Sequence, residues 1–449
     1  MRIGAVVAGR YRIVRQAGAG GMGHVHRAVD EATGDAVAIK LLSRLEPADR
    51  LRFRREAEAL AALTHPGIVR HVAHGEDGDQ PYLVMEWVDG ETLGERLAER
   101  GLTAAESLRA LTAAARALAE AHRHGVVHRD IKPANLIFAD EAAASIKLID
   151  FGIARRADDL GALTATGLLM GTPAYMAPEQ IRGDKGVDAR ADVFALGCVL
   201  HECLTGRQPF AGAHFLAVRA KVLFCYPPPA SVTASEVPPA LDELLARMLA
   251  KEPGQRPADA GEVAELLAAL PEPEATTRRP AGDGAEQTER VAASSDARVT
   301  CAVAASPFSD EDGGGAPTLS ASAREQLGVS VRQVGGKLET FPDGSVMAVF
   351  GPSREVRATV LTAADWAIAA RPRFDDGVVA LVSVRGDAVA DALARVARLL
   401  AKEARTSVFA GVTVSPPPDG SVRVDDTTAE LLGGQRGTVT RNGAAYLVP

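Results

Sequence analysis

The sequence predicts an α+β chain in which a small antiparallel β lobe precedes a larger helical lobe, a linker and a smaller α/β domain. Three observations indicate this order. Short β-rich runs broken by glycine cover residues 9–39, and long helical stripes dominate residues 103–270. After residue 299, strand and helix patterns alternate again. The expected elements there are strands at 299–304 and 377–384, a hairpin at 337–350, and helices around 319–329, 354–370 and 387–403.

The expected domain boundaries follow from length and composition. Because 449 residues exceed what one core accommodates, we expect two domains, at 9–270 and 299–449. Residues 271–298 are rich in Pro, Glu, Thr, Arg and Ala and carry almost no large apolar side chains. Such a segment cannot offset the entropy of ordering, so it predicts a disordered linker.

The overall composition argues against several classes of protein. The formal net charge is −8, from 50 Lys and Arg against 58 Asp and Glu, which favours neither a nucleic-acid nor a membrane-surface partner. Apolar stretches such as 193–204 fall short of the roughly 20 residues that span a bilayer, and the N-terminus does not resemble a signal peptide. The 4 cysteines lack the paired spacing of a zinc site. We therefore expect a cytoplasmic chain.

Each element of the first domain has its own signal. A helix at 48–63 should end at His65-Pro66-Gly67, a strong stop. Thr103 and Glu106 have the form of a capping box, and an apolar helical stripe follows until Gly125. The remaining expected elements are strands at 11–15, 25–29, 36–39, 68–74 and 81–87, and helices at 193–205, 241–250 and 258–270.

Two short polar blocks carry the chemistry. The first runs from His128 to Asn135 and contains Asp130, and the second is Asp150-Phe151-Gly152. Apolar stretches at 136–138 and 146–149, with a polar turn between them, predict a hairpin that brings both carboxylates to the opening of one site. In phosphoryl transfer, one such carboxylate accepts the proton of the attacking hydroxyl while an amide and a second carboxylate hold a divalent metal.

A glycine-rich run precedes these blocks. Gly18, Gly20, Gly23 and Val25 fit G-x-G-x-x-G-x-V, in which glycines let backbone amides approach phosphates. Alone, the run is weak evidence. The alternative is a dinucleotide-binding loop, which requires a helix after the glycines, whereas a strand pattern follows them here.

The order of motifs resembles the protein kinase family. It comprises the glycine run, the strand lysine Lys40, and the blocks at 128–135, 150–152 and 177–179. Residues 171–179 and 192–197 are similar in particular to bacterial serine/threonine kinases of the eukaryotic type. The resemblance covers residues 9–270 and implies the bilobal kinase fold, with ATP as substrate and Mg²⁺ as the metal.

The resemblance implies catalytic and metal-binding roles for matching residues. Asp130 would be the catalytic base, Lys132 would stabilise the transferred phosphate, and Asn135 and Asp150 would bind magnesium. A lysine two positions after the catalytic aspartate is typical of serine/threonine rather than tyrosine kinases. Glu179 and Arg256 resemble a structural pair of the family, and Asp192 a structural residue.

It also implies an ATP site. Lys40 would reach the α and β phosphates and form an ion pair with Glu56, with Glu58 as the alternative partner. Met85 would line the rear of the pocket. The remaining residues expected to contact ATP are Gly18, Gly20, Gly23 and Val25 through the glycine run, and Glu86 and Val88 through their backbone.

Arg129, directly before Asp130, indicates control by phosphorylation, because a phosphate in the activation loop would pair with it. Thr164 and Thr166 are the best candidate acceptors, with autophosphorylation in trans as the expected route. The alternative is that both are ordinary solvated loop threonines.

The second domain resembles the central hairpin of class III nucleotide cyclases, at residues 335–339, 343–350 and 397–399. A P-loop is excluded because Leu338 stands where Ser or Thr should bind metal. The opening strand at 299–304 is not followed by the first metal-binding aspartate of the family, and Ala394 replaces its transition-state asparagine. We interpret the domain as degenerate, non-catalytic and used for regulation or dimerisation; an unrelated α/β sensor is the alternative.

The sequence therefore favours a serine/threonine protein kinase that acts on protein substrates and is tuned by its second domain, with a homodimer possible. One alternative is a kinase-fold scaffold with little phosphoryl transfer, although no catalytic residue is missing. Another is cyclic-nucleotide synthesis by the second domain, which the missing aspartate and Ala394 disfavour.

Overall fold

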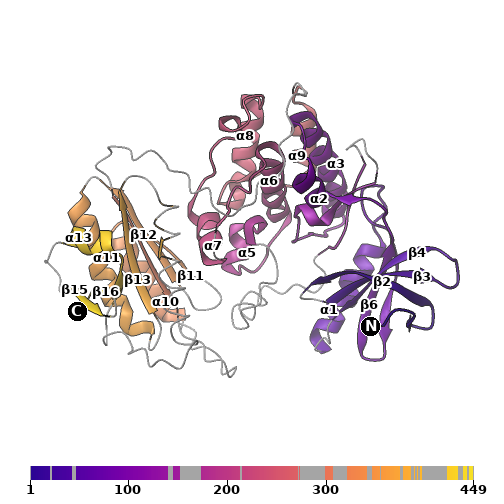
Figure 1. Cartoon of the computed structure of the whole chain (residues 1–449), viewed down its shortest axis with the longest axis horizontal. Coiled ribbons are helices and arrows are strands. Elements are labelled where there is room, and N and C mark those ends of the chain that lie inside the picture. Colours follow the sequence, from indigo (N-terminus) through magenta and orange to yellow (C-terminus); the bar gives the residue numbers. More distant parts are fainter. Residues whose placement is uncertain are drawn as a thin grey trace.

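The structure is a computed structural model of the chain. It describes residues 2–20, 23–42, 47–139, 145–151, 173–212, 215–271, 273, 299–306, 321–340, 346–353, 355–374, 378–385, 422–432, 438–441 and 444–447, with residues 389, 392, 395 and 396. The expected linker at 271–298 and the expected helix at 387–403 lie almost entirely outside this set. Figure 1 shows the small lobe at the right, the helical lobe in the middle and the second domain at the left.

The small lobe contains an antiparallel sheet, as the sequence predicts, and its strand order is β1-β2-β3-β4-β6-β5. Helix α1 (Pro47–Ala61) follows β4. The strands are β1 (Val6–Val7), β2 (Tyr11–Gly20), β3 (Gly23–Asp30), β4 (Ala36–Leu42), β5 (His71–Asp77) and β6 (Gln80–Glu86). One face of this sheet carries a closed apolar core that includes Ile13, Ala28, Ile39 and Val84. The other face is therefore left to form the candidate site.

The large lobe is mainly helical. Its α3 begins at the predicted capping box, in which Thr103 and Glu106 cap each other's backbone amides. A small sheet of β7 (Glu91–Thr92), β8 (Leu136–Phe138) and β9 (Ile146–Leu148) contains the predicted hairpin. The helices are α2 (Leu93–Glu99), α3 (Ala104–Arg123), α5 (Pro178–Arg182), α6 (Ala189–Thr205), α7 (Phe215–Phe224), α8 (Pro239–Met248) and α9 (Ala260–Ala268), with 3-10 turns at Pro133–Asn135, Pro173–Tyr175, Ala230–Val232 and Pro253–Gln255.

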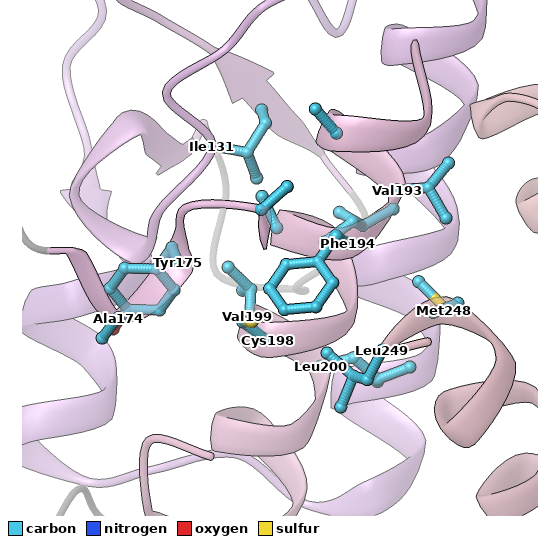
Figure 2. Packing of buried hydrophobic residues seen from close by; sticks show 14 of the residues in the cluster. Ile131, Ala174, Tyr175, Val193, Phe194, Cys198, Val199, Leu200, Met248 and Leu249 are labelled. Atoms are coloured by element: carbon cyan, nitrogen blue, oxygen red, sulfur yellow. The ribbon is translucent and has the colours of Figure 1, made fainter. Parts of the chain in front are cut away.

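Helix α6 is the centre of the large-lobe core. Its residues from Ala191 to Thr205 are buried, and Figure 2 shows Phe194 and Leu200 packed near Met248 and Leu249 at the end of α8. A Cβ on Gly197 would lie 3.0 Å from the Met248 Cβ, so the glycine allows the close approach of α6 and α8. This helix can thus serve as a rigid support for the loops that lie over it.

Lys251 is an unusual charge in this core. Its ammonium lies 4.2 Å from the ring centroid of Phe210 and 5.2 Å from that of Tyr226, and no described residue accepts a hydrogen bond from it. Burial lowers the pKa of Lys251 to about 7 from its ordinary value of 10.5. The aromatic faces offset part of the desolvation cost.

We expect Lys251→Met to stabilise the protein at pH 7 by on the order of a few kcal/mol. Between pH 7 and 10.5 the unfolded chain binds more protons at Lys251 than the folded chain, so the wild type gains stability as pH rises through that window. The advantage of the variant should therefore shrink towards pH 10. Urea unfolding at both pH values measures it, with the exposed Lys185→Met as control. An advantage that does not change with pH would contradict the lowered pKa.

The second domain is a seven-stranded sheet with order β11-β12-β10-β13-β14-β16-β15. The predicted strand at its start, the predicted hairpin and the helix after it are confirmed by β10 (Val299–Ser306), β11 (Lys337–Thr340), β12 (Val346–Ser353) and α11 (Val356–Ala370). The other elements are α10 (Ala321–Gln333), the 3-10 turn Arg371–Phe374, β13 (Val378–Arg385), β14 (Val422–Val424), α13 (Asp426–Leu432), β15 (Thr438–Arg441) and β16 (Ala444–Leu447).

Alternation along these strands buries both faces of the sheet. Cys301 and Val303 belong to a core that includes residues of α10, α11 and α13. Ala302, Met347 and Val382, on the opposite face, belong to the same continuous apolar cluster as the large-lobe core. The second sheet is therefore joined to the first domain through one of its faces.

Candidate active site

A row of residues crosses the small-lobe sheet from strand to strand. Gly18 of β2 pairs with Val25 of β3, Val25 pairs with Lys40 of β4, and Lys40 pairs with Leu83 of β6. Directly opposed residues in a sheet project to the same face. Val25 and Lys40 therefore lie side by side, away from the closed core that holds Ile39 and Leu41.

Gly18 and Gly23 of the glycine run differ in whether their surroundings leave room for a side chain. Gly23 has φ of +144°, and a Cβ there would lie 1.9 Å from the carbonyl oxygen of Leu41, so only glycine fits. At Gly18 a Cβ would meet no described atom within 4 Å. The backbone at Gly18 can therefore be approached by a ligand, whereas Gly23 is required for the contact between β3 and β4. Residues 21 and 22 lie outside the described set.

Lys40 is tied to Asp150, 110 residues away, by an ion pair of 2.9 Å between Nζ and Oδ1. Burial acts to raise the pKa of Asp150, but the charge and hydrogen bond of Lys40 and the charge of Lys132 outweigh it and hold the pKa below its ordinary value. Asp150 is therefore a carboxylate at neutral pH.

The predicted partner of Lys40 was Glu56, on α1. Lys40 makes an ion pair with Asp150, and the roles of Glu56 and of its alternative Glu58 as partners of Lys40 stay predictions. Both glutamates lie on α1, Glu56 half-buried and Glu58 exposed.

Helix α6 holds the loop that carries Asp130 through hydrogen bonds to Asp192. Asp192, which is 1% exposed, accepts hydrogen bonds of 2.7 Å from the backbone amides of both His128 and Arg129, and its Oδ2 lies 3.0 Å from Nε2 of His122. Arg129 has φ of +63°, which is rare for a residue with a side chain. The two charge-assisted hydrogen bonds stabilise that conformation.

Asp130, Lys132 and Asn135 converge on one point. Nζ of Lys132 donates to Oδ2 of Asp130 at 2.9 Å. Nδ2 of Asn135 donates to the backbone carbonyl of Asp130 at 2.7 Å and to its Oδ2 at 3.2 Å. These contacts fix the Asp130 carboxylate and turn the amide oxygen of Asn135 away from them, so the oxygen can act as a ligand.

Two contacts connect this loop to Asp150. Nε2 of His128 lies 3.0 Å from the Ile149 carbonyl, and the backbone amide of Ile149 donates to the Asn135 carbonyl at 3.0 Å. Burial lowers the pKa of His128, which keeps its imidazole neutral. Asp150 itself has φ of +58°. The predicted hairpin thus brings the loop of Asp130 and the segment of Asp150 together.

The segment after β6 joins the two lobes. The backbone amide of Glu86 already donates to the Arg70 carbonyl at 2.9 Å. A hydrogen bond from Glu86 to adenine would therefore have to use the backbone carbonyl of Glu86. Its carboxylate accepts from Nζ of Lys147 at 2.5 Å. Val88 is half-buried two residues on. The adjoining pocket is lined by Lys40, Leu42, Phe53, Leu60, Val69, His71, Leu83, Met85, Asp150 and Phe151.

Sequence reasoning missed two contacts of this site. One is the Lys147–Glu86 pair, and the other is the hydrogen bond from Nε2 of Gln180 to the Arg129 carbonyl at 3.0 Å. The paired residues are 61 and 51 positions apart in the sequence, and no local pattern signals such pairs.

The predicted phosphorylation sites Thr164 and Thr166 lie outside the described residues. Within the described residues, no helix has both the length and the apolar character needed to cross a membrane.

Comparison with known proteins identifies the class. The protein kinase domain matches residues 11–268, more than half of the chain, and the chain therefore belongs to the protein kinase family. It is 40% identical over 293 residues to the serine/threonine-protein kinase PknB of Mycolicibacterium smegmatis, covering 63% of this chain and 46% of PknB. It is 39% identical over 317 residues to PknA of Mycobacterium tuberculosis, covering 66% of this chain and 72% of PknA.

A similar solved structure is the crystal structure of the Mycobacterium tuberculosis PknI kinase domain. It has 30% sequence identity and a TM-score of 0.48, and the match covers 60% of this chain and 98% of that domain. The chain spans about half the length of its PknB relatives.

Proposed function

We propose that the chain is an ATP- and magnesium-dependent kinase that transfers the γ-phosphoryl group to Ser or Thr hydroxyls of proteins. The observation that carries this proposal is the cluster of Asp130, Lys132 and Asn135, with the Lys40–Asp150 ion pair close to it. A carboxylate held by two donors is oriented to accept the proton of an incoming hydroxyl. Phosphoryl transfer depends mainly on such positioning and on charge stabilisation.

The donor set fits magnesium. Asp150 is ionised and Asn135 presents its amide oxygen, and both are hard oxygen ligands of the kind that Mg²⁺ prefers. When bound, the ion would neutralise charge on the β and γ phosphates. Lys132, which donates to Asp130, would stabilise the transferred group, and Lys40 would supply a positive charge on the face where Gly18 leaves the backbone open.

The test is phosphate incorporation from γ-labelled ATP, with and without magnesium, followed by mass spectrometry. We expect phosphate on Ser or Thr, with Thr164 and Thr166 among the sites, and none after the metal is chelated. Phosphotyrosine alone would contradict the assignment of acceptor class. ATP binding without incorporation on the chain or on an added protein acceptor would favour the scaffold instead.

We infer that the second domain is a degenerate cyclase-like domain with a regulatory role. The strand, helix, hairpin, helix, strand order from β10 to β13 supports this interpretation. The opening strand β10 carries no carboxylate with which to bind a metal. Incubation with ATP or GTP and manganese should therefore yield no cyclic nucleotide. A homodimer stays a prediction, which light scattering of the purified chain would test.

A further inference from the structure

An ion pair bridges the two domains at a defined point. Arg182, the last residue of α5, donates from Nε to Oε2 of Glu339 at 2.9 Å and from Nη2 to Oε1 at 2.8 Å. Glu339 lies on β11, the edge strand of the second sheet. The side chains are 21% and 20% exposed. Two parallel hydrogen bonds between a guanidinium and a carboxylate fix orientation as well as distance.

An independent observation supports a real contact between the domains. One face of the second sheet, which includes Ala302, Met347 and Val382, belongs to the same apolar cluster as the large-lobe core. Figure 1 shows α5 and α7 on the side of the large lobe that faces the second domain, with β11 and β12 opposite them. The ion pair thus accompanies buried apolar surface.

Helix α5 also contacts the catalytic loop. Gln180, two residues before Arg182, donates to the carbonyl of Arg129 at 3.0 Å and accepts from the Ala177 amide at 2.9 Å. The helix directly follows the 3-10 turn Pro173–Tyr175, and Gln180 holds it against the residue that precedes Asp130. A domain held at the end of α5 therefore lies next to the surface that a protein acceptor has to reach.

We propose that the second domain docks on α5 through Glu339 and thereby restricts access of protein acceptors to the site. This inference rests on the proposed kinase function. A partly exposed ion pair contributes little binding energy by itself, so the pair mainly sets the orientation of the docked domain. ATP is small and binds at the small-lobe sheet, so its access is unaffected.

The pair can be tested by charge reversal in the full-length chain. Arg182 is flanked by Glu252 and Asp184, so Arg182→Glu brings its new carboxylate against both of them and Glu339. Glu339→Arg opposes two guanidinium groups. The double variant Arg182→Glu/Glu339→Arg restores opposite charges across the interface. Glu430→Arg, on the exposed surface of α13 away from the β11 edge, is the matched control.

Two quantities are measured for each variant: hydrogen exchange of the peptides that contain α5 and β11, and kcat/KM for a general protein acceptor such as casein. We expect both single variants to exchange faster and to raise kcat/KM by about 5-fold or more, with an unchanged KM for ATP. The double variant should move back towards the wild type, and Glu430→Arg should match the wild type.

The outcomes separate the proposals. Unchanged exchange in both single variants would overturn the docking, and faster exchange with unchanged kcat/KM would overturn the restriction of acceptors. If no variant, including the wild type, transfers phosphate, the proposed function and the restriction fall together, while the exchange data still decide whether the domains dock.

Discussion

Asp130→Asn is expected to lower kcat for protein phosphorylation by about 100- to 10,000-fold, the usual contribution of a positioned general base. An amide has nearly the shape of the carboxylate but cannot accept the proton of the hydroxyl. Its oxygen can still accept hydrogen bonds from Lys132 and Asn135, which lie 2.9 and 3.2 Å from Oδ2. The loop should therefore keep its conformation, and the loss should appear in kcat rather than in the KM for ATP.

The controls separate chemistry from folding. The melting temperature and the ATP affinity of the variant should equal those of the wild type, and Asp35→Asn, in an exposed turn after β3, should leave kcat unchanged. A variant that retains wild-type kcat would show that Asp130 is not the base.

Arg256→Ala is expected to destabilise the protein by about 3 to 5 kcal/mol, because it leaves a buried carboxylate without its partner. The guanidinium, with 0% of the side chain exposed, donates to both oxygens of Glu179 at 2.7 and 2.9 Å. It also donates to the carbonyls of Ala250, Lys251 and Arg190. Its removal therefore disconnects α5 from the segment after α8.

The matched control is the Arg247–Glu262 pair, whose side chains are 50% and 41% exposed. Arg247→Ala should cost less than about 1 kcal/mol, as is typical of surface pairs. Adding Glu179→Gln to Arg256→Ala should recover part of the lost stability, since the unpaired charge is then absent. Urea unfolding measures all of these values, and equal costs for the two arginine variants would contradict this account.

Most of the candidate site could be predicted from the sequence because its residues sit in short blocks whose local conformation determines their placement. The alternation of Val37, Ile39 and Leu41 with Lys40 on β4 already predicts which face the lysine occupies. The two apolar stretches between Asn135 and Asp150 already predict the hairpin. The capping box of Thr103 and Glu106 already predicts the start of α3.

What could not be predicted depends on contacts between distant segments. The ion pair of Lys40 with Asp150 is one case, because it joins residues 110 positions apart. The Arg182–Glu339 pair joins residues 157 positions apart, and the burial of Lys251 depends on rings from three other segments. Neither periodicity nor capping patterns carry such information.

The row from Gly18 through Val25 and Lys40 to Leu83 has a consequence for the way the small lobe folds. A slip of β4 by one residue would turn the Lys40 ammonium into the apolar core and expose Ile39, because side chains alternate between the faces of a strand. The lysine that would bind ATP therefore also penalises the wrong strand pairing. A substitution such as Lys40→Met removes that penalty, so misregistered folding and aggregation of the small lobe can accompany the loss of its charge.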